Sequence, residues 1–178
     1  MPTIRPLNFS DADPKTAATL HAVKAKLGVI PNLLATLANA PAAFNGYLQL
    51  SETLGSGRLN ARQREIVALA TAQENACQYC LSVHTLMAKG AGLSEAEIRQ
   101  ARAGAGSDAT DAAIAAFAQR VVRQRGRLEA TAVADARARG LDDGLILEII
   151  ANVALSVLTN YTNHVAATEI DFPKVDLD

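Results

Sequence analysis

The sequence predicts an all-α protein folded as a helical bundle, and three observations support this prediction. Apolar residues make up 49% of the 178 residues, whereas aromatic residues make up only 4%. The chain can therefore bury a core, but it is poor in the aromatic residues that favour strands. Apolar residues recur at three- and four-residue intervals, and no segment alternates as a strand would. We expect a single domain over residues 1–178.

Capping and stop signals divide the chain into successive helices. Asp13-Pro14 opens the first helix, whose inward face carries Leu20, Val23 and Leu27 and which ends at Gly28. Further helices are expected after Pro31, after Pro41, from near Asn60, over 77–89, from Ser94, over 112–124, over 130–139, and from Asp142 or Asp143 through Ala167. The remaining residues, 171–178, should form an extended tail because they contain Pro173.

A weak internal repeat relates residues 59–84 to residues 141–167, which share a leucine, an acidic turn and an apolar helix. This repeat predicts two similar helical units packed against each other, one carrying thiols and the other amides. Alanine-rich helices also match by chance. A shift of 83 residues gives these pairs: Glu65 with Glu148, Cys77 with Asn160, and Cys80 with Asn163.

Charge and hydropathy exclude several classes of partner. The net charge of −1 provides no strong field to attract nucleic acid or an anionic membrane. The longest apolar run, 149–158, is too short to cross a bilayer, and residues 1–10 lack the pattern of a signal peptide. We therefore expect a cytoplasmic protein. In a reducing compartment, its two cysteines are not expected to form a passive structural bridge.

The two cysteines, Cys77 and Cys80, are separated by two residues at the expected start of the helix 77–89. Such a pair can form an intramolecular disulfide. Asn75 is the expected N-cap, which would place Cys77 in the first turn. The helix dipole and the free N–H groups there would stabilise a thiolate, the form of cysteine that attacks peroxides and disulfides.

Two further residues are candidates for proton transfer. His84 follows Cys80 by four residues, so both lie on one helix face, and its side chain should lean back over Cys80. An imidazole there could accept the thiol proton. Glu65, on the preceding helix, could reach this neighbourhood if the two helices pack antiparallel, and could then orient the imidazole.

Each of these residues also has a purely structural interpretation. The cysteines could simply pack, or could bind zinc with His84, but a structural zinc site needs a fourth protein ligand. His84 could be a core histidine, and Glu65 a favourable surface acid in the first turn of its helix. Tyr79 could donate a proton or only cover the disulfide. His164 could satisfy buried partners, line the pocket or contact another subunit.

At these residues the chain resembles the carboxymuconolactone decarboxylase superfamily, in its alkylhydroperoxidase D-like branch of peroxidase-related proteins. The matching motif is a glutamate followed by Cys-x-x-Cys-x-x-x-His: Glu65, Cys77, Cys80 and His84. Flanking segments at 27–32, 160–164 and 168–173 are also similar. The resemblance implies an all-helical fold with internal duplication and a homo-oligomer, commonly a trimer or hexamer.

The resemblance also implies a function. Cys80 would be the peroxidatic thiol, Cys77 the resolving thiol, and His84 and Glu65 parts of a proton relay that needs no cofactor and no metal. The reductant would be a dithiol, lipoyl- or thioredoxin-like. One departure is that Tyr79 replaces the histidine that this branch has between its cysteines.

Helix-terminus reasoning favours Cys77 as the nucleophile, whereas the resemblance and the His84 spacing favour Cys80. We choose Cys80 because a local base is more specific than a helix dipole. Two other functions stay open at this point. One is decarboxylation of a lactone acid, and the other is a non-catalytic helical oligomer that senses oxidants through its disulfide.

Overall fold

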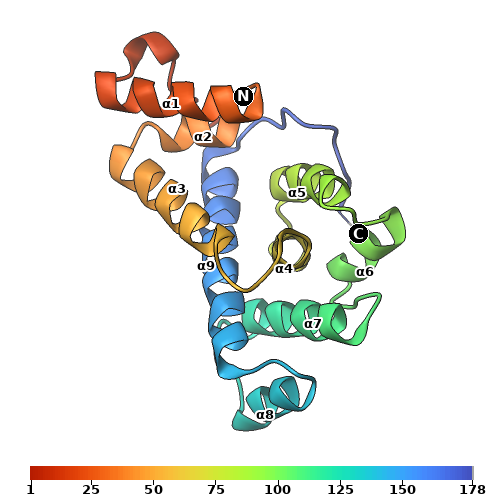
Figure 1. The fold of residues 1–178 in the computed structure, drawn as a ribbon. Coiled ribbons are helices and arrows are strands. Elements are labelled where there is room, and N and C mark those ends of the chain that lie inside the picture. The colour runs from red at the N-terminus through yellow and green to blue at the C-terminus, as the bar shows by residue number, and fades with distance from the viewer. Residues whose placement is uncertain (178) are drawn as a thin grey trace.

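The computed structural model describes residues 1–177, and the described chain contains nine α-helices, one short 3₁₀-helix (Phe9–Asp11) and no strand (Figure 1). The predicted all-α class is therefore confirmed. The helices are α1 (Pro14–Leu27), α2 (Asn32–Leu37), α3 (Pro41–Gly55), α4 (Ala61–Glu74), α5 (Gln78–Gly90), α6 (Glu95–Arg102), α7 (Ala109–Arg123), α8 (Ala130–Ala138) and α9 (Asp143–Ala166).

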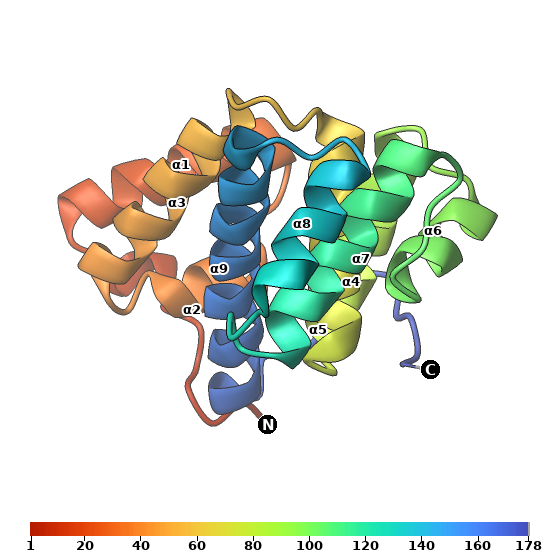
Figure 2. The ribbon, with the colours of Figure 1, turned by 90° about the horizontal axis from the view of Figure 1, so that it is seen from below.

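Helix α4 lies at the centre of the bundle, enclosed by α5, α6, α7 and α9. Figure 1 shows α4 end on within this ring. Every residue of α4 from Glu65 to Ala72 is buried, as expected for a helix surrounded on all sides. Helix α9 runs along one side of this group, with α1, α2 and α3 on its other flank (Figure 2).

Four of the predicted helix starts are confirmed by side-chain caps. Asp13 caps α1, Asp142 caps α9, and capping boxes begin α4 at Asn60 and α6 at Ser94. Helix α7 begins at 109, three residues before the predicted start, because Asp108 accepts from the N–H of residue 111. This cap adds a polar first turn that the apolar periodicity does not reveal.

Two predictions about individual residues are wrong. Leu27 is 53% exposed, so the buried face of α1 carries Leu20 and Val23 without it. Asn75 does not cap the cysteine helix; it is the C-cap of α4. Cys77 itself is the N-cap of α5, which runs from Gln78 to Gly90 rather than over 77–89.

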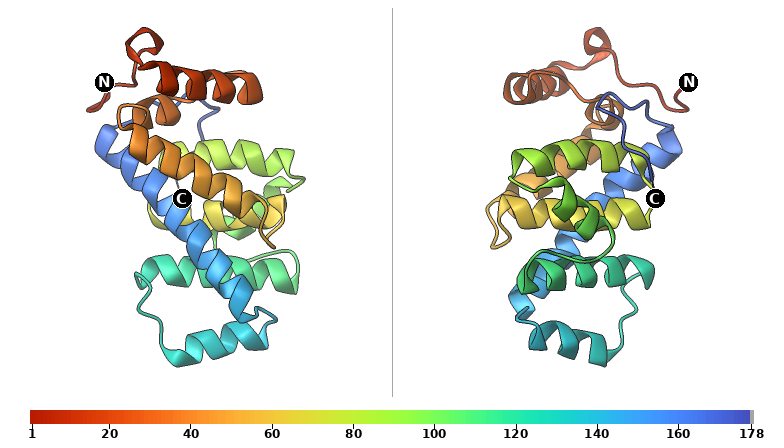
Figure 3. Two further views of the ribbon diagram at one scale, coloured as in Figure 1. Left: turned by 60° about the vertical axis from the view of Figure 1, so that its left-hand side comes forward. Right: turned by 90° about the vertical axis from the view of Figure 1, so that its right-hand side faces the viewer.

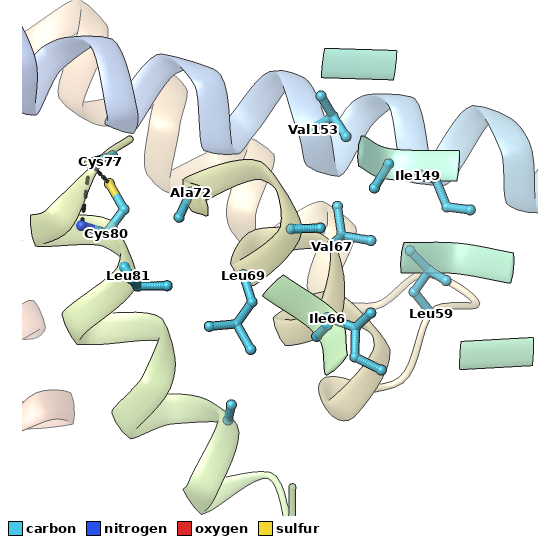
Figure 4. Packing of buried hydrophobic residues seen from close by; sticks show 14 of the residues in the cluster. Leu59, Ile66, Val67, Leu69, Ala72, Cys77, Cys80, Leu81, Ile149 and Val153 are labelled. Atoms are coloured by element: carbon cyan, nitrogen blue, oxygen red, sulfur yellow. Dashed lines mark hydrogen bonds between the residues drawn. The ribbon is translucent and has the colours of Figure 1, made fainter. Parts of the chain in front are cut away.

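A turn in a Schellman arrangement separates α4 from α5 and fixes the position of the cysteines. The Cys77 N–H donates to the Ala72 carbonyl at 2.9 Å, and the Ala76 N–H donates to the Gln73 carbonyl at 3.0 Å. Ala76 adopts a left-handed conformation with φ of +52°, which this motif usually assigns to glycine. The sharp reversal places both cysteines beside α9 (Figure 4).

Helix α9 is 24 residues long and apolar enough, by length and composition, to cross a membrane. It contacts α2, α3, α4, α5 and α7, and Ile149 and Val153 pack into the central cluster (Figure 4). These contacts are those of a core helix in a helical bundle. The apolar run predicted over 149–158 is shorter than this helix because α9 also contains neutral polar residues.

The C-terminal tail is extended over 171–177, as predicted, and Asp178 lies outside the described residues. The tail passes from the end of α9 across α5 (Figures 1 and 3). The Asp171 carboxylate accepts from the Asn32 N–H at 2.8 Å, and the Val175 N–H donates to the Ser82 hydroxyl at 3.0 Å. The tail therefore ties the start of α2 to the cysteine helix.

Candidate active site

The two cysteines are free and lie side by side at the start of α5. Their sulfur atoms are 2.6 Å apart, and the Cys80 N–H donates to the Cys77 sulfur at 3.3 Å (Figure 4). A disulfide has a sulfur–sulfur distance of about 2.0 Å, so oxidation of this pair needs little movement. The predicted juxtaposition of Cys77 and Cys80 is thus present.

The two thiols have opposite tendencies to ionise. Hydrogen bonding from the Cys80 thiol lowers the pKa of Cys77 to about 7, although burial acts in the opposite direction. The Cys80 N–H, His164 and Asn163 lower this pKa further. The hydrogen bond with Cys77, burial and the negative charge of Cys77 raise the pKa of Cys80. Of the two thiols, Cys77 is therefore the one that ionises more readily, and Cys80 retains its proton.

Glu65 and His84 form a hydrogen-bonded pair, with the Glu65 Oε2 atom 2.8 Å from the His84 Nδ1 atom. Both side chains are mostly buried, which excludes the interpretation of Glu65 as a surface acid. Burial lowers the pKa of His84, but the Glu65 carboxylate and the Cys77 thiolate outweigh it, so the pKa is raised. Among the described residues, the hydrogen-bond partner of the His84 ring is Glu65 and not a sulfur.

Helix α9 supplies a group of amides on the other side of the cysteines. Asn163 donates from Nδ2 to the Cys80 sulfur at 3.2 Å, and Asn75 donates from Nδ2 to the Asn160 Oδ1 atom at 2.9 Å. Asn163 and Cys80 are one of the pairs that the 83-residue shift aligns. The two units differ, however, because α9 is continuous where α4 and α5 are separated by a turn. The duplication stays a prediction.

His164 reaches the turn that precedes the cysteines. Its Nε2 atom lies 2.9 Å from the Asn75 carbonyl oxygen. A carbonyl only accepts, so Nε2 carries the proton. The imidazole also lowers the pKa of Cys77. His164 is exposed, so its role here is to hold the turn and act on Cys77 from the protein surface.

Tyr79 has a structural role at the start of α5. Its hydroxyl accepts from the Leu33 N–H at 3.2 Å, and its ring makes an edge-to-face contact with Phe172 at 5.7 Å. Burial raises the pKa of Tyr79, and Asp171 adds to this effect. The phenol thus anchors α2 and the tail to α5, and the two roles considered from the sequence, proton donation and covering of the disulfide, stay predictions.

Tyr47 of α3 is a site residue that sequence reasoning missed. Burial raises the pKa of Tyr47 to about 12, with further contributions from the negative charges of Cys80 and Glu65. Its phenol therefore responds electrostatically to both groups. No local spacing in the sequence connects Tyr47 to the cysteines.

Both cysteines are only 1% exposed, but their surroundings are polar rather than hydrocarbon alone. A cavity of about 290 Å³ lies between α7 and α8, away from the sulfurs. His84 and Tyr47, by contrast, are partly exposed.

Within residues 1–177, no cluster of three or more His, Cys, Asp and Glu side chains could hold a metal ion.

Comparisons with solved structures identify the class of fold. The chain superposes on a peroxidase-related protein from Ralstonia eutropha JMP134, which is described as an alkylhydroperoxidase AhpD core. The TM-score is 0.85, and the two sequences are 20% identical over 96% of this chain and 92% of the other. A peroxidase-related protein from Silicibacter sp. TM1040 gives 0.81 and 23% identity over 94% and 92%. The fold is that of the AhpD-like all-helical proteins.

A family model also matches part of the chain. Residues 41–124, nearly half of the chain, match the model of the carboxymuconolactone decarboxylase family, so the resemblance found in the sequence is confirmed. This segment contains Glu65, Cys77, Cys80 and His84. Among curated proteins, none matches the chain significantly.

The same fold also carries a different chemistry. The chain superposes on the debrominase Bmp8 with a TM-score of 0.78 and 20% identity over 95% of this chain and 92% of the other. A second structure of that debrominase is a cysteine-to-alanine variant in complex with 2,3,4-tribromopyrrole. At this identity the likeness concerns the fold and not the reaction.

Proposed function

We propose that this protein is a thiol-dependent peroxidase that reduces hydroperoxides through a Cys77–Cys80 dithiol–disulfide cycle. The observation that supports this proposal is the pair of free sulfurs 2.6 Å apart, one of them ionised near neutral pH. The Glu65–His84 pair next to them can exchange protons. A site built only for packing needs neither the ionised thiol nor the buried ion pair.

The proposed reaction begins with transfer of the Cys80 proton to the Cys77 thiolate across their contact. The Cys80 thiolate then attacks the terminal oxygen of the hydroperoxide, so that a sulfur–oxygen bond forms as the oxygen–oxygen bond breaks. The alkoxide leaves as an alcohol, taking a proton that the His84–Glu65 pair supplies. Cys80 becomes a sulfenic acid, and the peroxide is reduced.

The second half of the cycle closes the disulfide. Cys77 returns its proton to the His84–Glu65 pair and attacks the Cys80 sulfur. The pair gives this proton to the departing hydroxide, so the sulfenic oxygen is released as water. A dithiol reductant of the lipoyl or thioredoxin type then restores both thiols and is itself oxidised to a disulfide. The hydroperoxide would enter beside the partly exposed side chains of His84 and Tyr47, because the sulfurs themselves are covered.

Mass spectrometry of the reduced protein tests this proposal directly. One equivalent of hydrogen peroxide should remove the mass of two hydrogen atoms and join Cys77 to Cys80. In the Cys77→Ser variant, the same treatment should instead leave a sulfenic acid on Cys80 that a dimedone probe traps. Steady-state peroxide consumption with lipoyl and thioredoxin dithiols then measures turnover, with the Cys80→Ser variant as the control without the nucleophile.

The other functions predict different outcomes in these experiments. A decarboxylase has no need of the thiol pair, so a double variant with serine at both positions would keep full activity on a lactone acid. A redox sensor would oxidise once, slowly, and change its assembly state without turnover. Peroxide exposure that leaves both thiols reduced would contradict the peroxidase proposal.

A further inference from the structure

Two buried amides next to Cys80 each have one end without a partner. Asn160 is fully buried and Asn163 is 6% exposed. Among the described residues, the Asn160 Nδ2 atom and the Asn163 Oδ1 atom have no hydrogen-bond partner. A buried donor or acceptor without a partner is costly in a folded protein, so two of them on one helix turn indicate a function.

The hydrogen bonds of the other end of each amide fix which end is free. The Asn160 Oδ1 atom accepts from Asn75 at 2.9 Å, which leaves the Asn160 Nδ2 donor free. The Asn163 Nδ2 atom donates to the Cys80 sulfur at 3.2 Å, which leaves the Asn163 Oδ1 acceptor free. Reversing Asn163 would place an oxygen against a sulfur that must become a thiolate.

The free donor and the free acceptor belong to residues three positions apart on α9, so they lie on the same helix face. Both side chains reach Cys80, since hydrogen bonding from each amide lowers the pKa of its thiol against the larger opposing effects of Cys77 and burial. The contact of Asn160 Nδ2 with the sulfur is not a well-formed hydrogen bond, so this donor is available to a bound oxygen. One N–H donor and one C=O acceptor beside a sulfur are complementary to a single O–H group, whose oxygen accepts and whose hydrogen donates.

We propose that the Asn160 Nδ2 and Asn163 Oδ1 atoms bind the terminal O–H group of a hydroperoxide at Cys80. This inference rests on the proposed peroxidase function and names the site of its substrate. The terminal oxygen accepts from Asn160, and its hydrogen donates to Asn163. When the Cys80 sulfur attacks that oxygen, the O–H group stays in place and becomes the hydroxyl of the sulfenic acid. The leaving alkoxide departs on the side away from the amides.

This arrangement also supports Cys80 as the site of oxidation although Cys77 is the resting thiolate. Asn163 Nδ2 lies 3.2 Å from the Cys80 sulfur and 4.0 Å from the Cys77 sulfur. The Asn163 amide is therefore placed at Cys80 rather than at Cys77. A donor and an acceptor that hold the attacked oxygen next to the sulfur lower the barrier by positioning it, because the negative charge of the transition state develops on the leaving oxygen.

The test compares two small neutral reagents that attack the same thiol. In the Cys77→Ser background, Cys80 is oxidised by hydrogen peroxide or alkylthiolated by methyl methanethiolsulfonate, which has no O–H group. The ratio of the two second-order rate constants cancels any change in the thiolate fraction of Cys80. A variant that removes the oxygen site lowers this ratio, whereas a variant that only loosens the fold changes both rates together.

Asn160→Asp is the first variant, because it keeps the Oδ1 acceptor for Asn75 and replaces only the free donor with an oxygen. We expect its peroxide-to-thiolsulfonate ratio to fall by about 10-fold or more, because the oxygen loses a group that positions it. Asn160→Leu, which removes both polar ends, should lower the ratio similarly. Thr162→Ala is the matched control, because Thr162 lies on the same helix and its hydroxyl donates to the Leu158 carbonyl, and its ratio should stay within about 2-fold of the background.

The outcomes separate this inference from the function on which it rests. If Cys80 reacts with the thiolsulfonate but not with peroxide in the Cys77→Ser background, the peroxidase proposal itself fails. If Cys80 reacts with both reagents and either folded Asn160 variant keeps the ratio, the peroxidase proposal stands and the amide site is overturned. An equal fall of the ratio in the Thr162→Ala control would also overturn the amide site.

Discussion

The Nδ1 atom of His84 on α5 lies 2.8 Å from the Oε2 atom of Glu65 on α4, which joins the two helices at the cysteine site. Burial alone would lower the pKa of this imidazole, and the carboxylate outweighs that effect and raises it. Because the pKa is raised on folding, the pair stabilises the protein below the ordinary histidine pKa of about 6.5. This contribution is lost as the pH rises through the raised pKa of His84.

Replacing Glu65 with Gln should lower the pKa of His84 below its ordinary value, because burial then has no opposing carboxylate. An NMR titration of the imidazole nitrogens measures this change directly. Peroxide turnover should fall about 100-fold, the lower end for loss of general acid–base catalysis. Glu74→Gln is the matched control on the same helix, since Glu74 pairs with Arg123 near the surface. A His84 titration unchanged in Glu65→Gln would contradict the assignment.

The thiolate of Cys77 should form with a midpoint near pH 7. Its absorbance at 240 nm and its alkylation by iodoacetamide should therefore rise with pH through that value. Cys80→Ala should move the midpoint upward, because it removes the thiol donor that contributes most to the lowered pKa. His164→Gln should move it upward by a smaller amount. If peptide mapping finds that Cys80 is alkylated first, the charge assignment is wrong.

Ala76→Gly should stabilise the protein, because Ala76 has a φ of +52° in the turn between α4 and α5. Glycine adopts this conformation without steric cost, and the gain should be up to about 1 kcal/mol in urea unfolding. Gly92→Ala is the reciprocal control, since Gly92 has a φ of +88° and open space around its Cα. It should lose a similar amount. A destabilised Ala76→Gly variant would show that the turn is unstrained.

The tail should contribute to the stability of the cysteine helix. Phe172 packs against Tyr79 at 5.7 Å between ring centroids, and Phe172→Ala removes this contact. Because Phe172 is only half-buried, we expect a loss of about 1–3 kcal/mol, less than for a fully buried phenylalanine. Lys174→Ala, at an exposed position of the same tail, is the control. Equal unfolding midpoints for the two variants would mean that the tail does not brace α5.

The homo-oligomer expected from the family resemblance stays a prediction, and α9 has the surface for it. Its outer face carries exposed apolar residues at three- and four-residue steps, the pattern that packs against another helix. These exposed residues are Leu147, Ile150, Ala154, Leu158, Tyr161 and Val165. Leu158→Glu should shift the protein to smaller species in analytical ultracentrifugation. Gln100→Glu on α6 should not, and a wild-type monomer at micromolar concentration would contradict the prediction.

The helical fold and most helix starts could be predicted because their signals are local. Asn60 with Gln63, Ser94 with Glu97, and Asp142 each satisfy N–H groups within three residues. The start of α5 was missed because Ala76 does not favour the left-handed conformation on its own. Contacts from α9 support that turn: His164 with the Asn75 carbonyl, and Asn160 with the Asn75 side chain.

The sequence by itself determined which residues are candidates for the site, because Cys77, Cys80 and His84 are related by spacing along one short segment and Glu65 by one helix packing. Only the tertiary structure decided which cysteine ionises more readily, that His84 pairs with Glu65, and that Asn163 donates to Cys80. The last of these depends on helix α9, which is distant in the chain. Spacing along one helix determines which residues share a face. The pKa shifts of the cysteines and the unpaired amides beside them arise only when several helices pack around the two sulfur atoms.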